Sequence, residues 1–295
     1  MRLIAFYGEE AIRVGRVEGD EAIVGGGSLD PSGRLDEEFA DALGWVATDS
    51  EERFPLRGLE PAPLVLAPTK IVCVGLNYRE HAAEGGRDAP TRPLLFGKFS
   101  NAIVGDGDPV IRPEGTHALD LEVELGVVIG RRARRVTRET AMEHVAGYVV
   151  VNDISARDWQ GTPQALREGE KGDGQWLRAK GSDSFLPMGP MLVTTDEVDP
   201  AAGLRLRSWR IDGNGLEHLM QDGTTADMIH DVPALVAFIS SVITLEPGDL
   251  IATGTPSGVG VFRDPPVFLE PGDTVRCEVE GVGSVENPIV DWSEA

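Results

Sequence analysis

The stretch 119–129, LDLEVELGVVI, decides how this chain folds. Asp120, Glu122 and Glu124 alternate with apolar residues before the run becomes continuously hydrophobic. A period of two is typical of a β-strand, in which successive side chains point to opposite faces. We therefore expect the three acidic side chains on one face of a strand and the apolar residues between them on the other.

Similar strand-like runs recur along the chain, and helical patterns are few and short. One helix is expected around 35–43, one over 78–86, and one that begins after Asp231, whose side chain can cap it. Because long helices do not alternate with the strands, the sequence predicts a mainly β (α+β) architecture with a few covering helices. The expected strands lie in 2–8, 11–19, 21–26, 70–75, 147–152, 188–198, 204–212 and 274–281.

Length and charge narrow the function classes. The chain has 295 residues, with 27 Lys and Arg against 49 Asp and Glu, a net charge of −22. Such an acidic surface repels nucleic acids and anionic membranes, so neither is an expected partner. Cys73 and Cys277 lie in apolar runs and predict buried thiols without a disulfide or a zinc site. With no signal peptide and no apolar run long enough to span a bilayer, a cytoplasmic protein is expected.

A proline-rich segment at 55–68 divides the chain. Its composition is typical of a linker or of an extended strand that follows the protein surface. It predicts a small β-rich N-terminal domain over 1–62 and a larger second domain over 68–295.

Acidic residues suggest a metal site. Glu122 and Glu124 share a strand face, and paired carboxylates in a core need a cation between them. The alternative is a solvated strand face that carries alternating charges. Asp153 follows the apolar run GYVVVN at 147–152, a place where ligands are often found, although an Asx turn would also explain it.

Two further residue groups could carry chemistry. On a helix, His81 and Glu84 share one face, so the carboxylate could orient the imidazole as a general base. A surface ion pair is the competing interpretation. Lys180, one of only four lysines, lies between apolar runs and could stabilise an oxyanion, or it could be an ordinary surface lysine. The glycine-rich stretch 254–262 predicts a tight turn with Thr255 exposed.

Five strings in order resemble the fumarylacetoacetate hydrolase family: VGLNYREHAAE (74–84), LDLEVELGVVIG (119–130), GYVVVNDISARDWQ (147–160), WLRAKGSDSFLPMGPMLVT (176–194) and LEPGDLIATGTPSGVG (245–260). They are most similar to the branch known as fumarylacetoacetate hydrolase domain-containing proteins. The resemblance implies a mixed β-sandwich roll of the family's C-terminal-domain type, which usually forms a homodimer and binds a divalent cation.

The resemblance also assigns roles to residues. It implies Glu122, Glu124 and Asp153 as ligands of Mg²⁺ or Mn²⁺, with Ca²⁺ as a substitute in a crystal. It implies His81 and Glu84 as a catalytic pair on a lid and Lys180 as the site lysine. Arg157, Gln160 and Thr255 match substrate-binding positions. Leu76 stands where relatives commonly have Arg, and the lysine motif reads KGSDSF (180–185) in place of KSFDTF.

These residues fit an enzyme that acts on a small 2-oxo or 2,4-dioxo acid. We expect hydrolysis of a carbon–carbon bond in an acylpyruvate or fumarylpyruvate, through an enolate that the metal stabilises. Oxaloacetate decarboxylation or keto–enol tautomerisation on the same site is the first alternative. A catalytically silent binding protein is the second.

Overall fold

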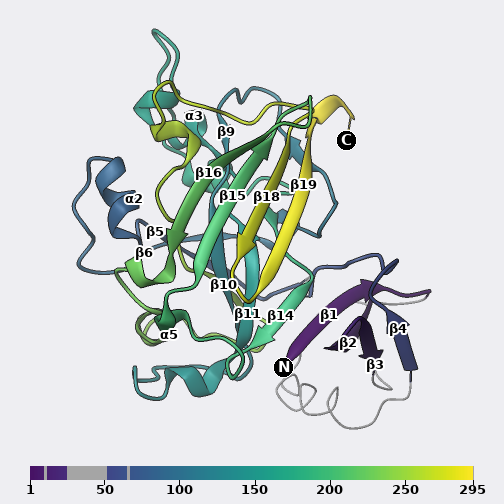
Figure 1. The fold of residues 1–295 in the computed structure, drawn as a ribbon. Helices are drawn as coiled ribbons and strands as arrows, with labels where there is room; N and C mark the ends of the chain where they lie inside the picture. Colours follow the sequence, from purple (N-terminus) through teal and green to yellow (C-terminus); the bar gives the residue numbers. More distant parts are fainter. Residues whose placement is uncertain (10–11, 25–51, 65–66, 295) are drawn as a thin grey trace.

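The computed structural model describes residues 1–9, 12–24, 52–64 and 67–294. Two β-sheets pack face to face, with short helices around their edges (Figure 1). A five-stranded sheet lies across β10 (Val123–Ile129) and β11 (Val145–Asn152) of a ten-stranded sheet. The mainly β architecture with few helices is therefore confirmed. The helix expected around 35–43 lies outside the described residues.

The larger sheet carries the site. It combines antiparallel neighbours with one parallel pair, β17 (Leu250–Ala252) and β5 (Ile71–Gly75). In spatial order its strands are β4 (Glu52–Pro55), β3 (Glu21–Val24), β2 (Ile12–Glu18), β1 (Arg2–Tyr7), β14 (Met191–Thr194), β11 (Val145–Asn152), β10 (Val123–Ile129), β17 (Leu250–Ala252), β5 (Ile71–Gly75) and β6 (Leu94–Lys98).

The smaller sheet is built mainly from C-terminal strands. In spatial order these are β16 (Glu217–Thr224), β15 (Arg205–Ile211), β18 (Thr274–Val279), β19 (Gly283–Asp291) and β8 (Val110–Arg112). Two short pairs complete the strands: β12 (Ser155–Ala156) with β9 (Leu119–Asp120), and β13 (Leu186–Pro187) with β7 (Ile103–Val104).

The helices are short, and three of them position site residues. The α-helices are α2 (Arg79–Glu84), α3 (Arg157–Gln160), α4 (Trp176–Lys180) and α5 (Val232–Ser240). The 3₁₀ turns are η1 (Ser100–Ala102), η2 (Ala141–His144), η3 (Pro163–Ala165), η4 (Pro200–Ala202), η5 (Thr225–Asp227), η6 (Gly260–Phe262) and η7 (Trp292–Glu294). Asp231 caps α5 as predicted, because its Oδ1 accepts the Ala234 N–H at 3.1 Å. None of the helices in the described residues is long and apolar enough to cross a membrane.

A core of apolar side chains fills the space between the sheets. Leu125 of β10 belongs to the same buried cluster as Leu206 of β15 and Cys277 of β18, and each is fully buried. Cys73 and Cys277 are free and buried, which confirms the interpretation of both as small hydrophobic residues. This packing makes β10 and β11 a rigid base for the polar residues at their ends.

The expected strand at 119–129 is interrupted, and its environment differs from the prediction. β9 ends at Asp120 and β10 begins at Val123, so Glu122 lies at the break. Every residue of the stretch is buried. The alternative of a solvated acidic strand face is therefore wrong, because both sides of the stretch are covered by protein.

The N-terminal strands extend the larger sheet. β1 pairs antiparallel with β14, while β2, β3 and β4 continue outward from β1. Part of the proline-rich segment follows β1: the Tyr7 N–H donates to Glu60 O at 2.9 Å, and the Ala62 N–H donates to Ala5 O at 3.0 Å. This supports the extended alternative for residues 60–62. The division into domains 1–62 and 68–295 stays a prediction.

The sequence EPGD occurs twice, and both copies form the same turn. In each, the aspartate side chain accepts the backbone N–H of the glutamate three residues earlier: Asp249 from Glu246 at 2.7 Å, and Asp273 from Glu270 at 2.8 Å. Each aspartate also binds a basic side chain from another strand or its flank. Lys70 pairs with Asp249, and Arg210 donates Nε to Asp273 at 2.6 Å.

Candidate active site

Three buried carboxylates meet at the ends of β10 and β11. Glu122, Glu124 and Asp153, here called the inner cluster, are at most 5% exposed, and each offers an oxygen within 4.8 Å of the others. Strand register brings them together, because Val123 pairs with Asn152 and the Asp153 N–H donates to Glu122 O at 2.9 Å. Antiparallel pairing thus places Asp153 beside the two glutamates, a juxtaposition that spacing along the chain could not predict.

Two buried lysines neutralise part of the inner cluster. Lys180 Nζ, at the end of α4, donates to Glu122 Oε2 at 2.7 Å and to Asp153 Oδ2 at 2.8 Å. Lys98 Nζ lies 2.7 Å from Asp153 Oδ1 and donates to three main-chain oxygens, those of Ile154, Lys180 and Phe185. Lys180 is 2% exposed, so the alternative of an ordinary surface lysine is wrong.

Arg157 and Asp120 form a second layer around Glu122. Arg157 Nη2 lies 2.6 Å from Glu122 Oε1, and its Nε donates to Asp120 Oδ2 at 2.9 Å. Asp120 also accepts the N–H groups of Gly260 at 2.8 Å and Val261 at 3.1 Å. It thereby fixes the arginine and the glycine-rich segment relative to each other.

The carboxylates differ in their electrostatic environment. Burial opposes ionisation of Glu122, but the charges of Lys180 and Arg157 outweigh it and hold the pKa of Glu122 below its ordinary value. Burial raises the pKa of Glu124 well above its ordinary value, and the charges of Asp153 and Glu122 add to this shift. Among the described residues, Glu124 has no cation at ion-pair distance; its Oε2 accepts the Gly254 N–H at 2.8 Å.

The loop after β17 holds Glu124 from one side. Gly254 adopts φ +98°, and a Cβ there would lie 2.8 Å from the Cβ of Asn77, so a side chain would disturb the N–H that binds Glu124. Thr255 follows, and its hydroxyl donates to Val123 O at 2.9 Å and accepts from Gln221 Nε2 at 2.6 Å. Thr255 is only 3% exposed, so the expectation of an exposed side chain is wrong.

His81 and Glu84 form a positioned pair on α2. His81 Nδ1 lies 2.7 Å from Glu84 Oε1, and Glu84 Oε2 accepts the Gly258 N–H at 2.8 Å. His81 is 6% exposed, which rules out the surface ion pair. With Nδ1 directed at Glu84, Nε2 is the ring nitrogen left for a ligand.

A cavity of about 290 Å³ connects these groups. Its lining includes His81 and Gly85, the residue after Glu84, together with Glu122 and Glu124. The expected residues Arg157, Gln160, Lys180 and Thr255 also line it, and so does Leu76. Every residue predicted for the site therefore lies at this cavity or in direct contact with a residue that lines it; their roles stay predictions.

Three residues near the site were not predicted to belong to it. Asp120 shares the alternating pattern of Glu122 and Glu124, which was a usable signal. Lys98 is one of only four lysines in the chain, but nothing in its local sequence indicates that it contacts Asp153. Arg87 follows α2 and lines the cavity. Lys98 reaches the site only through tertiary packing, whereas Arg87 is placed beside it by the end of α2.

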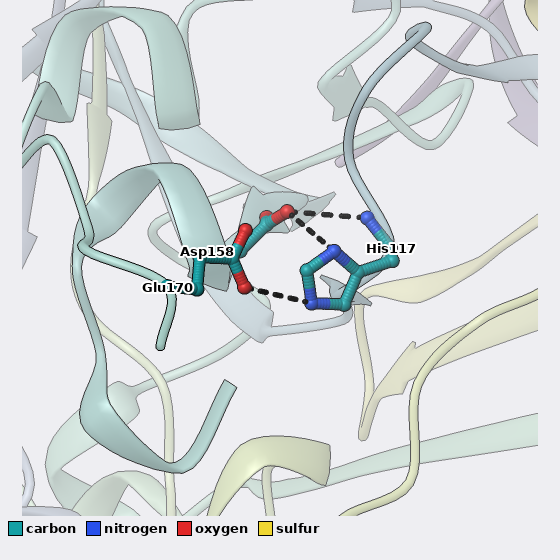
Figure 2. A group of neighbouring side chains, drawn as sticks. All are labelled: His117, Asp158 and Glu170. Atoms are coloured by element: carbon teal, nitrogen blue, oxygen red, sulfur yellow. Dashed lines mark hydrogen bonds and ion pairs between the residues drawn. The ribbon is translucent and has the colours of Figure 1, made fainter. Parts of the chain in front are cut away.

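A second group with metal-type ligands lies beside the site. His117, Asp158 and Glu170, here called the outer cluster, also offer ligand atoms within 4.8 Å of one another (Figure 2). His117 Nδ1 lies 3.2 Å from Asp158 Oδ2, and Nε2 lies 3.5 Å from Glu170 and 3.0 Å from Ala165 O. Both ring nitrogens thus already face oxygen atoms of the protein.

The inner cluster suits a divalent cation. With all four ionised, Asp120, Glu122, Glu124 and Asp153 would carry four negative charges against three positive ones on Lys98, Arg157 and Lys180. The unpaired carboxylate of Glu124 is the observation that tests the fit, since a buried charge needs compensation. Carboxylate oxygens are the ligands that Mg²⁺ and Mn²⁺ prefer. The residues present therefore fit such an ion.

Comparison with known proteins gives a consistent result. Residues 70–290 match the family model described as fumarylacetoacetate (FAA) hydrolase C-terminal. The mitochondrial oxaloacetate tautomerase of Xenopus laevis is 44% identical over 223 residues, which are 76% of this chain and 66% of that protein. A mitochondrial oxaloacetate tautomerase of Bos taurus is 46% identical over 226 residues, which are 77% of this chain and 68% of that protein. The match thus spans about two thirds of these relatives.

Solved structures extend the likeness to nearly the whole chain. A 2-hydroxyhepta-2,4-diene-1,7-dioate isomerase from Mycobacterium marinum is 36% identical with a TM-score of 0.76, over 99% of both chains. Fumarylacetoacetate hydrolase from Exiguobacterium antarcticum is 33% identical with a TM-score of 0.78, again over 99% of both chains. The fold, the site and these relatives agree that the chain is an enzyme that belongs to the fumarylacetoacetate hydrolase family.

Proposed function

We propose that the protein interconverts the keto and enol forms of a small 2-oxo acid of the oxaloacetate type. The observation that carries the proposal is that His81 lines the same cavity as Glu122, Glu124 and Lys180. A group that moves a proton thus faces a centre that suits a divalent cation. The names of the frog and bovine relatives favour tautomerisation over the hydrolysis expected from the sequence.

The residues divide the work as follows. Glu122, Glu124 and Asp153 would hold a divalent cation, Mg²⁺ or Mn²⁺, which when bound stabilises negative charge on the oxygens of a 2-oxo acid. Glu84, fixed by the Gly258 N–H, accepts a hydrogen bond from the N–H at His81 Nδ1, which keeps the proton on Nδ1 and leaves Nε2 free to act as a base. His81 Nε2 takes a proton from the substrate carbon or hydroxyl and returns it to the other atom.

Lys180 is less free than His81. Its ammonium group has three hydrogens, and two of them are directed at Glu122 and Asp153. One hydrogen remains for a substrate oxygen, which suffices to stabilise the enol oxygen. Arg157 is held by Asp120 and Glu122, so it orients Glu122.

Carbon–carbon hydrolysis of an acylpyruvate is the second candidate. The His81–Glu84 pair could equally activate a water molecule, and the solved relative from Exiguobacterium antarcticum is named a hydrolase. Oxaloacetate decarboxylation would use the same centre without a base. The cytoplasmic location and the homodimer stay predictions; sedimentation of the purified protein would test the latter.

The test follows three substrate signals with Mg²⁺ present. Decay of the ultraviolet absorbance of enol-oxaloacetate reports tautomerisation, pyruvate release from an acylpyruvate reports hydrolysis, and pyruvate release from oxaloacetate reports decarboxylation. We expect the rate of this absorbance decay to increase with enzyme concentration. His81→Ala should lower the enzyme-catalysed rate by about 10²–10⁴-fold. His218→Ala, near the start of β16 and away from the residues that line the cavity, is the matched control. Enol decay at the enzyme-free rate together with cleavage of the acylpyruvate would replace the tautomerase with the hydrolase.

A further inference from the structure

Four basic residues line the cavity, and they differ in what they are free to bind. Arg157 contacts Asp120 and Glu122, and Lys180 contacts Glu122 and Asp153. His81 faces Glu84. Arg87 is the fourth, and its guanidinium has no hydrogen-bond or ion-pair partner among the described residues. The cavity therefore has one arginine whose charge has no partner in the part of the chain that the structure describes.

The backbone of Arg87 is fixed close to the catalytic pair. After α2 ends, the Gly86 N–H donates to Ala83 O and the Arg87 N–H donates to Ala82 O, both at 2.9 Å. Gly86 takes φ +64°, the left-handed conformation that ends a helix in this way. Arg87 thus follows His81 and Glu84 at a set distance, while its side chain is exposed at the cavity.

Charge balance shows what such an arginine would be needed for. With Glu124 ionised, the form in which it would bind a cation, the four carboxylates around the inner cluster exceed their three cations by one negative charge, and Glu84 adds another beside the cavity. A bound divalent cation compensates these charges but leaves none over for a substrate with two carboxylates. A second carboxylate in the same small cavity needs a further cation.

We propose that Arg87 determines substrate specificity by binding the distal carboxylate of a 2-oxo dicarboxylic acid. The inference rests on the proposed function and names the substrate class of that site. A guanidinium presents parallel N–H groups that match a carboxylate, so Arg87 would select dicarboxylates over 2-oxo acids that end in a methyl group. Arg87 follows the helix that carries His81. Binding of the distal carboxylate by Arg87 would therefore also help to position the His81 imidazole.

The test compares two stable ligands that differ at the distal end alone. Malate carries a carboxylate where 2-hydroxybutyrate carries a methyl group, and neither has a keto group to react. Calorimetry with Mg²⁺ gives the dissociation constant of each for the parent, Arg87→Gln and Arg92→Gln. Arg92 is the matched control, because it is an exposed arginine of the same loop that does not line the cavity. A thermal melt checks that each variant is folded.

We expect the parent to prefer malate, and Arg87→Gln to weaken malate binding about tenfold while 2-hydroxybutyrate binding is unchanged. Arg87→Lys should fall in between, and Arg92→Gln should match the parent. Equal weakening of both ligands, no weakening of either, or no preference for malate in the parent would overturn the proposal. A parent that fails to tautomerise oxaloacetate but shows the Arg87-dependent preference would overturn the proposed reaction and leave the assignment of Arg87 intact.

Discussion

The inner and outer clusters each bring three metal-type ligands within 4.8 Å, yet their surroundings differ. In the inner cluster all three carboxylates are buried, and Glu124 lacks a cation among the described residues. In the outer cluster the side chains of His117 and Glu170 are 20% and 35% exposed, and both ring nitrogens face oxygen atoms. Proximity of ligands is thus a weaker indication of a metal site than burial with incomplete charge compensation.

The largest expected difference between the clusters is in metal binding. Glu124→Gln removes the carboxylate that has no cation, whereas Glu170→Gln removes an exposed one. We expect Glu124→Gln to lower Mg²⁺ affinity and activity by more than the roughly 10–100-fold that loss of an outer-shell partner costs. Glu170→Gln should leave both unchanged. Calorimetric titration with Mg²⁺ checks this, and equal affinities in the two variants would remove the distinction between the clusters.

A stability measurement sharpens the same comparison. Lys98→Met leaves Asp153 and three main-chain oxygens without the ammonium group that binds them in the protein interior. We expect the free energy of unfolding to fall by about 3–5 kcal/mol, the usual cost of breaking a buried ion pair from one side. Glu170→Gln should cost at most about 1 kcal/mol, because Glu170 itself is exposed to solvent. Urea denaturation of the two metal-free variants measures both; similar midpoints would contradict the prediction.

The smallest effect is expected at a half-buried carboxylate in a surface turn. Asp212, in the turn between β15 and β16, accepts N–H groups of Leu216 and Asn214 and lies beside His218. These contacts, the Leu216 N–H foremost, lower the pKa of Asp212. The stability that this ionised carboxylate contributes is present above the ordinary carboxyl pKa and is lost as the pH falls through the lower folded-state pKa.

Thermal melts at a series of pH values test that sign. Asp212→Ala should melt slightly below the parent at neutral pH, and the difference should shrink as the solution is acidified below the ordinary carboxyl pKa. A difference that stays constant from neutral to strongly acidic pH would show that the turn geometry, and not the charge of Asp212, is responsible.

The local parts of the structure could be predicted from the sequence, and the long-range parts could not. The cap of Asp231 and the turns at both EPGD sequences depend on residues within a few positions of each other. The approach of Asp153 to Glu122 depends on strand register, and the sequence alone left it open until the family resemblance supplied it. Lys98 contacts Asp153 from another strand of the sheet, and no periodicity indicates that contact.

The paired EPGD turns have a practical consequence for engineering the chain. Each aspartate accepts the backbone N–H of the glutamate in its own turn and also pairs with one basic residue from elsewhere. Each turn is therefore held by one local contact and one distant contact. The turns at 246–249 and 270–273 are identical in sequence, so the distant residue, Lys70 or Arg210, distinguishes them. Exchanging those two residues would place an ammonium group where a guanidinium group now binds Asp273, and a guanidinium group where an ammonium group now binds Asp249. The two turns belong to different sheets, so relocating β5 would mean moving Lys70 with it, and relocating β15 would mean keeping Arg210, while the four-residue turns stay unchanged.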